Sequence, residues 1–221
     1  FHQDLLHEMP LDAMQSQDLI SVSWGLGSHG TEKLKRLFDV VASATALVLT
    51  APLLVIVAIA VSISSGGSLL YRQTRTGRFG VPFEILKFRT MRVDAEAGGP
   101  VWARENDDRV TPLGRFLRRS RLDELPQLWN ILKGEMSFVG PRPERPEFVK
   151  ELEREIPFYQ LRHLVPPGLT GWAQIRYPYG ASVADARRKL GFDLYYVRNY
   201  GLRFDLGICL KTAVSMARGS R

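Results

Sequence analysis

The sequence is poor in the residues that form disulfides and metal centres. The single cysteine, Cys209, cannot form an intramolecular disulfide and fits a reducing compartment. The four histidines, His2, His7, His29 and His163, are scattered along the chain without the short spacings of a zinc site. We therefore expect neither a disulfide framework nor a zinc centre in this protein.

The sequence also lacks a pattern typical of nucleic-acid binding. It contains no zinc-finger, RNP or homeodomain-like motif, and its basic residues are dispersed among apolar ones. The net charge of +7 and the isoelectric point near 9.7 nevertheless indicate an anionic partner. We expect phosphorylated substrates or anionic lipid headgroups, and no nucleic acid.

The first 30 residues lack the basic start and the small-residue cleavage site of a signal peptide. We interpret residues 1–30 as a connector that remains from an N-terminal extension. Within it, residues 21–24 are a candidate short strand, and residues 25–30 a flexible joint. The 221 residues suit one sizeable domain plus such an appendage.

A long uncharged run occupies residues 40–63. About 24 helical residues extend roughly 36 Å, which is enough to cross a hydrocarbon core of about 30 Å. Pro52 lies near the middle, where proline removes a backbone hydrogen bond and kinks a helix. Hydroxyl groups that can bond the freed carbonyls are available on Ser43, Thr45 and Thr50.

Basic residues flank this run on both sides. They are Lys33, Lys35 and Arg36 before it, and Arg72, Arg75 and Arg78 after it. The positive-inside rule places such segments on the cytoplasmic side, which a spanning helix cannot do for both of its ends. We therefore predict a re-entrant membrane helix over residues 31–67, broken at Pro52. A plain transmembrane helix with a tolerated proline remains the alternative. Asp39 is expected to pair with Arg36 where the helix begins.

Residues 68–221 are predicted to form an α+β domain, predominantly helical with a small β-hairpin. The hairpin is indicated by two short runs, residues 69–73 and 83–89, on either side of a glycine-containing turn at residues 76–80. Lys87 and Arg89 alternate with apolar residues and share one strand face. That basic face either is solvated or contacts phosphate.

Five helices are predicted in the rest of this domain. Thr111 and Pro112 begin the first, whose apolar face comprises Leu113, Phe116 and Leu117. The second buries Leu125, Leu128, Trp129 and Leu132, has Pro126 in its first turn and ends at Gly134. The others cover residues 144–155, residues 182–196 with a capping box of Ser182 and Asp185, and residues 204–217. Residues 94–108 are predicted to form a mobile polar loop, and residues 166–172 a turn-rich one.

Asp123 and Glu124 lie where the second of these helices begins. The structural interpretation is a capping box with Ser120 and favourable first-turn charge. The functional interpretation rests on Arg115, Arg118, Arg119 and Arg121, because guanidinium groups bind phosphate oxygens in a planar fork. Such surroundings keep Asp123 ionised, as a carboxylate nucleophile must be. Two adjacent acids that face a diphosphate can also hold Mg²⁺.

Residues 140–143 (GPRP) form a second candidate element of the site. Two prolines restrict the backbone, so this segment presents Arg142 in a nearly fixed conformation. Arg142 is either a clamp on a phosphate or a solvated arginine in a turn.

These motifs, in this order, resemble the bacterial sugar transferase family, the monotopic polyprenyl-phosphate phosphoglycosyl transferases. The resemblance covers nearly all of residues 33–210. It is carried by residues 35–39 (KRLFD), 71–77 (YRQTRTG), 86–91 (LKFRTM), 121–127 (RLDELPQ), 138–143 (FVGPRP) and 167–174 (PGLTGWAQ). Residues 143–146 (PERP) and 177–180 (YPYG) resemble the exopolysaccharide-type branch, whose members carry an N-terminal extension.

The resemblance implies a re-entrant helix broken at Pro52, although Ala51 replaces the serine usual before that proline. It implies a ping-pong reaction in which the carboxylate matching Asp123 attacks the β-phosphate of a UDP-sugar and releases UMP. Polyprenyl (undecaprenyl) phosphate then attacks the phosphosugar intermediate. Glu124 matches a second acid, assigned to Mg²⁺ or to proton transfer. Phosphate or substrate binding is assigned to Arg118, Arg142, Lys87, Thr170 and Gln174.

The resemblance further implies a place in the bacterial inner membrane, with residues 68–221 on the cytoplasmic face and membrane lipid as a partner. Whether the protein forms a homodimer stays open. Two other functions also stay open. A membrane-bound nucleotide-sugar hydrolase would release UMP without a lipid acceptor, and a non-enzymatic basic scaffold would be indifferent to substitution of Asp123.

Overall fold

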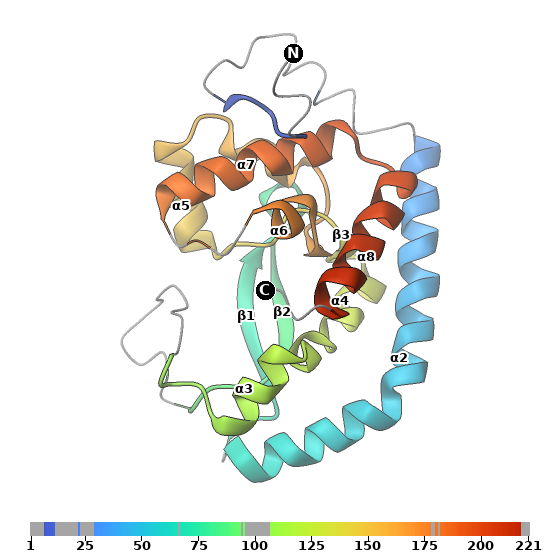
Figure 1. Ribbon diagram of the computed structural model, residues 1–221, viewed down its shortest axis with the longest axis vertical. Coiled ribbons are helices and arrows are strands. Elements are labelled where there is room, and N and C mark those ends of the chain that lie inside the picture. Colours follow the sequence, from blue (N-terminus) through green and yellow to red (C-terminus); the bar gives the residue numbers. More distant parts are fainter. Residues whose placement is uncertain are drawn as a thin grey trace.

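The computed structural model describes residues 7–11, 22, 29–65, 67–93, 95, 107–177, 180 and 182–217. Over these residues the protein is mostly helical with two two-stranded sheets, which confirms the predicted α+β class (Figure 1). The predicted joint and mobile loop lie mostly outside the described residues. Val22, from the candidate strand, is helical and buried in the core, so packing and not strand pairing determines its conformation.

The uncharged run forms helix α2 (His29–Ser65), which contains Pro52 and is continuous in its helical assignment. Figure 1 shows that α2 changes direction about half-way along, so that it has two arms. The missing N–H and the ring of a proline explain such a bend. Pro52 has no N–H, so the carbonyl of Val48 lacks its usual helical donor. The hydroxyl of Thr50 does not replace that donor, because it donates to the carbonyl of Ala46 at 2.7 Å. Because the helical assignment is continuous through Pro52, α2 bends and does not break into two.

The second arm of α2 packs on the domain with only one of its faces. Val57 and Val61 are buried against Phe88 and Leu117. By contrast, Ile63 is 81% exposed. An 18-residue window of this helix has a mean hydropathy of 2.8, so α2 is long and apolar enough to cross a membrane, and it is the only such helix among the described residues.

The predicted hairpin is confirmed. Strands β1 (Leu70–Thr76) and β2 (Pro82–Phe88) pair antiparallel, with Tyr71 opposite Lys87. Helix α3 (Pro112–Arg119) follows, and the Thr111 hydroxyl caps it by accepting from the N–H of Gly114 at 2.9 Å, as predicted. Helix α4 (Gln127–Lys133) ends at Gly134, whose φ of 91° is a left-handed conformation open to glycine.

Two predicted core residues are exposed. Phe116 of α3 is 61% exposed, and Trp129 of α4 is 51% exposed. The face of α4 that is buried contains Asn130 instead, whose side chain donates to the carbonyl of Glu84 at 2.7 Å and accepts from the N–H of Leu86 at 3.1 Å. These bonds to β2 turn α4 away from the orientation that apolar periodicity predicted.

A second sheet was not predicted. Strand β3 (Ser137–Val139) pairs in parallel with β4 (Gly168–Thr170), within the segment expected to be a loop. Strands of three residues are too short to show an alternating pattern. A Cβ on Gly168 would lie 2.1 Å from the nitrogen of Gly140, so the two segments approach this closely only because residue 168 is glycine.

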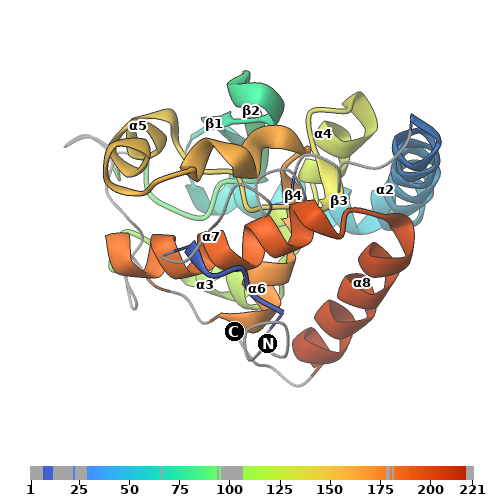
Figure 2. The same cartoon turned by 90° about the horizontal axis from the view of Figure 1, so that it is seen from above.

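Besides β4, the elements that follow β3 in the chain form the rest of the domain. They are α5 (Pro146–Glu155), η4 (Tyr159–Leu164), α6 (Trp172–Arg176), α7 (Val183–Arg198) and α8 (Leu202–Ala217). The capping box of Ser182 and Asp185 at the start of α7 is confirmed. Figure 2 shows α7 and α8 on one side of the molecule and the hairpin with α4 and α5 on the other, with the first arm of α2 seen nearly end-on. The main core lies on the inner face of α7, around Leu190, Leu194 and Tyr196.

Polar residues at the start of α2 attach it to the domain. Lys35 is buried and pairs with Asp205 of α8, so it is not a cation that flanks the membrane. Asp39 accepts a hydrogen bond from the backbone N–H of Phe138 at 3.1 Å.

Arg36 does not form the predicted pair with Asp39. Its guanidinium donates at 2.6 Å to the carbonyls of both Ile131 and Leu132 at the end of α4. Carbonyls in the last turn of a helix lack intrahelical donors and carry partial negative charge, so they attract this cation.

Candidate active site

Asp123 and Glu124 lie together in a single 3₁₀ turn, η3 (Leu122–Glu124), between α3 and α4. The chain enters this turn through Arg121, whose φ of 58° is left-handed. The hydroxyl of Ser120 donates back to the carbonyl of Phe116 at 2.9 Å. Ser120 therefore ends α3, and the interpretation of Asp123 as its capping-box partner is wrong.

Both acids line a cavity of about 490 Å³. Of the residues selected from the sequence, Lys87, Arg118, Arg142 and Gln174 also line it. Among the described residues, eleven lysines or arginines contribute to the lining against four acidic residues. This excess of positive charge favours a ligand with several negative charges.

Glu124 is held by three cations. Its carboxylate lies 2.8 Å from Nζ of Lys87, 3.5 Å from a guanidinium nitrogen of Arg142 and 3.7 Å from one of Arg121. Burial raises the pKa of Glu124, but the charges of Lys87 and Arg142 outweigh burial and lower this pKa well below its usual range. Glu124 is therefore a permanent anion that orients the cations around it.

Asp123 has the opposite environment. Its Oδ1 atom is buried and has no hydrogen-bond partner within the described part of the chain. Burial, with the neighbouring charge of Glu124, raises the pKa of Asp123 to about 6, although Lys87 and Arg118 oppose the shift. The arginines were predicted to stabilise the ionised form, but they are outweighed. Asp123 is still mainly ionised at pH 7, and it lines the cavity.

Arg118 is oriented by Thr90, a residue that the sequence reading missed. The Nε of Arg118 donates to the hydroxyl of Thr90 at 2.9 Å. Helix α3 comes this close because Gly114 faces the backbone of Thr90, where a Cβ would lie 2.0 Å from the carbonyl oxygen. The one signal for this contact was a glycine inside an otherwise helical segment.

Gln174 and Thr170 have different surroundings. The amide nitrogen of Gln174 donates to the carbonyl of Leu169 at 3.3 Å, while its Oε1 is buried without a partner in the described residues. That oxygen can accept a hydrogen bond from a ligand. The structure does not bring Thr170 to the cavity, because its hydroxyl lies against that of Thr212 on α8, 2.8 Å away.

No group of three or more His, Cys, Asp or Glu residues that could enclose a metal occurs among the described residues. Asp123 and Glu124 supply carboxylate oxygens, and the free Oδ1 of Asp123 has no other partner. Mg²⁺ is commonly held by one or two carboxylates together with substrate phosphates and water. The carboxylate chemistry of the two acids is therefore compatible with Mg²⁺.

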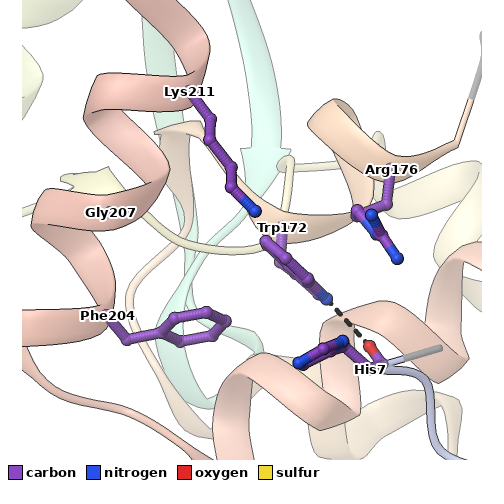
Figure 3. Close-up of a pocket in the computed structure, with 6 residues that line it drawn as sticks. All are labelled: His7, Trp172, Arg176, Phe204, Gly207 and Lys211. Atoms are coloured by element: carbon purple, nitrogen blue, oxygen red, sulfur yellow. Dashed lines mark hydrogen bonds between the residues drawn. The ribbon is translucent and has the colours of Figure 1, made fainter. Parts of the chain in front are cut away.

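A second cavity, of about 430 Å³, lies between α6 and α8 and contains none of the predicted residues (Figure 3). Trp172 is at its centre, and its indole N–H donates to the carbonyl of His7 at 2.8 Å. Lys211 lies over the same ring, with Nζ 4.9 Å from the ring centroid. Among the described residues, its lining contains no carboxylate, whereas the cavity around Asp123 contains the acid pair.

Comparison with known proteins identifies the family of the chain. The family described as bacterial sugar transferase matches residues 30–219. A "UDP-N-acetylgalactosamine-undecaprenyl-phosphate N-acetylgalactosaminephosphotransferase" of Aeromonas hydrophila is 42% identical over 186 residues, which cover 84% of this chain and 44% of the relative. The chain thus spans less than half the length of that relative.

Two further relatives are covered over most of their length. A "UDP-glucose:undecaprenyl-phosphate glucose-1-phosphate transferase" of Caulobacter vibrioides is 41% identical over 215 residues, 96% of this chain and 80% of the relative. The "Exopolysaccharide production protein PSS" of Rhizobium leguminosarum is 41% identical over 193 residues, 84% of this chain and 96% of the relative.

Proposed function

Because the chain belongs to the bacterial sugar transferase family, we propose that it transfers a phosphosugar from a UDP-sugar to polyprenyl phosphate and releases UMP. The names of two relatives supply the donor and acceptor classes, a UDP-sugar and undecaprenyl phosphate. The observation that carries the proposal is the buried, unbonded Oδ1 of Asp123 in the wall of a basic cavity.

In the first half-reaction, a carboxylate oxygen of Asp123 attacks the phosphorus that bears the sugar. A bond forms between the carboxylate oxygen and this phosphorus, and the bond from the phosphorus to the bridging oxygen breaks. UMP leaves with the bridging oxygen and its electron pair. The carboxylate is already ionised at neutral pH, so no base has to remove a proton from it.

In the second half-reaction, a phosphate oxygen of the polyprenyl acceptor attacks the same phosphorus. The bond to Asp123 breaks, and its carboxylate is restored with the electron pair. The product is a polyprenyl diphosphate that carries the sugar. The acceptor phosphate sits on a lipid, which explains why the site is attached to an apolar helix such as α2.

The cations of the cavity bind and orient the diphosphate. Arg118, fixed by Thr90, and Arg142, beside Glu124, offer guanidinium groups to phosphate oxygens. Lys87 adds a positive charge next to both acids. Magnesium held by Glu124 and Asp123 would neutralise charge on the diphosphate.

The bent helix supports a re-entrant arrangement in the bacterial inner membrane. We propose that both arms of α2 begin and end at the cytoplasmic face, where UDP-sugars are available. The bend half-way along α2 and the packing of its second arm on the hairpin favour this arrangement over a straight spanning helix (Figure 1).

The experiment that tests the function measures nucleotide release by the purified full chain from several UDP-sugars with Mg²⁺, with and without undecaprenyl phosphate. UMP release that requires the lipid is expected. Asp123→Asn should abolish it, whereas Asp108→Asn, an exposed acid outside the cavity, should retain it. Release of UDP, or an active Asp123→Asn variant, would contradict the proposal. UMP release without lipid would indicate the hydrolase.

A further inference from the structure

The segment that carries Arg142 cannot form a regular pattern of backbone hydrogen bonds by itself. Pro141 and Pro143 have no N–H, so the segment lacks the donors that a strand or helix would use. Nevertheless each carbonyl from Pro141 to Glu144 has a donor. The carbonyl of Pro141 accepts from the N–H of Gly168 at 3.0 Å, and that of Glu144 from the N–H of Thr76 at 2.9 Å.

The two carbonyls in the middle are bound by arginine side chains. Arg162 donates to the carbonyl of Arg142 at 2.9 Å. Arg75 donates to the carbonyl of Pro143 at 3.0 Å. These two arginines reach the segment from different elements, η4 and β1, and they donate hydrogen bonds to the carbonyls of consecutive residues.

Both guanidinium groups are themselves fixed. Arg162 is buried, and its other nitrogens donate to Asp193 at 3.0 Å and to the hydroxyl of Tyr159 at 2.7 Å. Arg75 donates to Gln73 at 2.5 Å and lies 3.6 Å from the carboxylate of Glu144. A planar guanidinium that is held by several hydrogen bonds restricts the movement of the carbonyl that it binds.

We propose that Arg162 and Arg75 are positioning residues, which act through Arg142 by fixing the backbone on which its guanidinium is aimed at Glu124. This inference rests on the proposed function. The guanidinium of Arg142 lies 3.5 Å from Glu124 and lines the cavity beside Asp123. A displacement of about 1 Å at a group that binds the reacting phosphate is enough to slow a reaction by about 100-fold.

A double-mutant cycle with Arg142→Ala tests this role. The variants are Arg162→Lys and Arg75→Lys, which keep the buried charge but lose the planar fork. In the full chain, each should lower kcat/KM for the UDP-sugar by about 10-fold or more, the size of a lost charge-assisted hydrogen bond. In the Arg142→Ala background the same substitutions should change kcat/KM by less than about 2-fold, because the group they position is gone.

The matched control is Arg78→Lys. Arg78 also donates to a backbone carbonyl, that of Leu164 at 3.1 Å, but it does not line the cavity. It should change kcat/KM by less than about 2-fold in either background. Thermal unfolding of each variant identifies any that fails to fold. If Arg162→Lys does not fold, Arg75→Lys still tests the role, because Arg75 is only partly buried whereas Arg162 is buried.

Binding of UDP, measured by calorimetry, separates the possible outcomes. If the wild-type chain neither binds UDP nor releases UMP, the proposed function and this inference fall together. If the wild type does both, but the losses in kcat/KM add to that of Arg142→Ala, the inference alone is overturned. Additive losses would mean that Arg162 or Arg75 contacts the ligand itself.

Discussion

At the residue scale, Asp123 and Glu124 are neighbours with opposite electrostatic surroundings. Glu124 meets Lys87, Arg142 and Arg121, whereas the buried Oδ1 of Asp123 meets no hydrogen-bond donor in the described residues. In free-energy terms, ionised Glu124 stabilises the fold and ionised Asp123 destabilises it. A carboxylate whose ionised form is destabilised by its surroundings is the arrangement expected of a nucleophile.

Amide substitutions of the two acids should therefore change stability in opposite directions. At pH 8, Asp123→Asn should raise the free energy of unfolding by roughly 1–3 kcal/mol, because it removes a buried charge whose pKa has moved from 3.8 to about 6. Glu124→Gln should lower it by about 3 kcal/mol, because three cations lose their partner. Chemical denaturation of both variants in the same detergent measures this. Destabilisation by Asp123→Asn would contradict the assigned environment.

The gain in the free energy of unfolding that Asp123→Asn produces should depend on pH. A carboxyl group whose folded pKa is raised favours the folded state more as pH falls through about 6 towards 3.8. The stability difference between Asp123→Asn and wild type should therefore shrink over this range.

The activity of the wild type should also depend on pH. Its kcat/KM should fall below about pH 6 by up to 10-fold per pH unit, because the protonated acid is no nucleophile. A flat profile between pH 5 and pH 8 would exclude Asp123 as the group that must ionise.

At the scale of elements, the contact between α3 and the chain after β2 decides where Arg118 lies. Gly114 lets the helix approach Thr90 until a Cβ would overlap the carbonyl oxygen, at 2.0 Å. The Thr90 carbonyl also accepts from the N–H of Thr111 at 3.0 Å, so the start of α3 is fixed there. The helix thereby delivers Arg118 to the hydroxyl of Thr90 at the cavity wall.

Gly114→Ala should displace α3 and lower both stability and activity. The added methyl group must move either the helix or the backbone of Thr90, which costs about 1–3 kcal/mol. The loss of the Arg118–Thr90 contact should reduce the rate of UMP release at least several-fold.

The matched control is Gly207→Ala in α8, where a Cβ meets nothing within 4 Å. Gly207→Ala should stabilise the protein by up to about 1 kcal/mol through helix propensity. Equal effects of the two substitutions, measured by thermal unfolding, would show that the close approach has no role.

At the scale of the whole molecule, α2 is attached to the domain along both arms. Its first arm is joined to α8 by the Lys35–Asp205 pair and to α4 by Arg36. Its second arm packs Val57 and Val61 on β2 and α3. Both arms of the helix thus pack against the same body, as the proposed re-entrant arrangement requires.

Cysteine labelling tests this topology. In a Cys209→Ser background, Thr31→Cys and Ser68→Cys place single thiols at the two ends of α2. Both should react with a membrane-impermeant maleimide from the cytoplasmic side of inverted vesicles and neither from the outside of intact spheroplasts. Labelling of the two positions from opposite sides would exclude the re-entrant arrangement.

Much of the fold was predictable because its signals are local. The hairpin, the cap at Thr111, the capping box at Ser182 and the proline bend each depend on a few consecutive residues. The parallel pairing of β3 with β4 was missed because it joins short segments that are distant in sequence. The exposure of Phe116 and Trp129 was missed because periodicity shows that a helix has an apolar face, not what will cover it.

For this protein, the sequence by itself determined the family, the acid pair and the arginine-rich motifs around it, because these residues are adjacent or rigidly spaced along the chain. Only the tertiary structure decided how the two acids differ. Lys87 on β2 and Arg142 after β3 come to Glu124 from segments far away in sequence, whereas Oδ1 of Asp123 has no donor within the described residues. Burial and charge at a carboxylate depend on what surrounds it in space, and spacing along a chain does not report that.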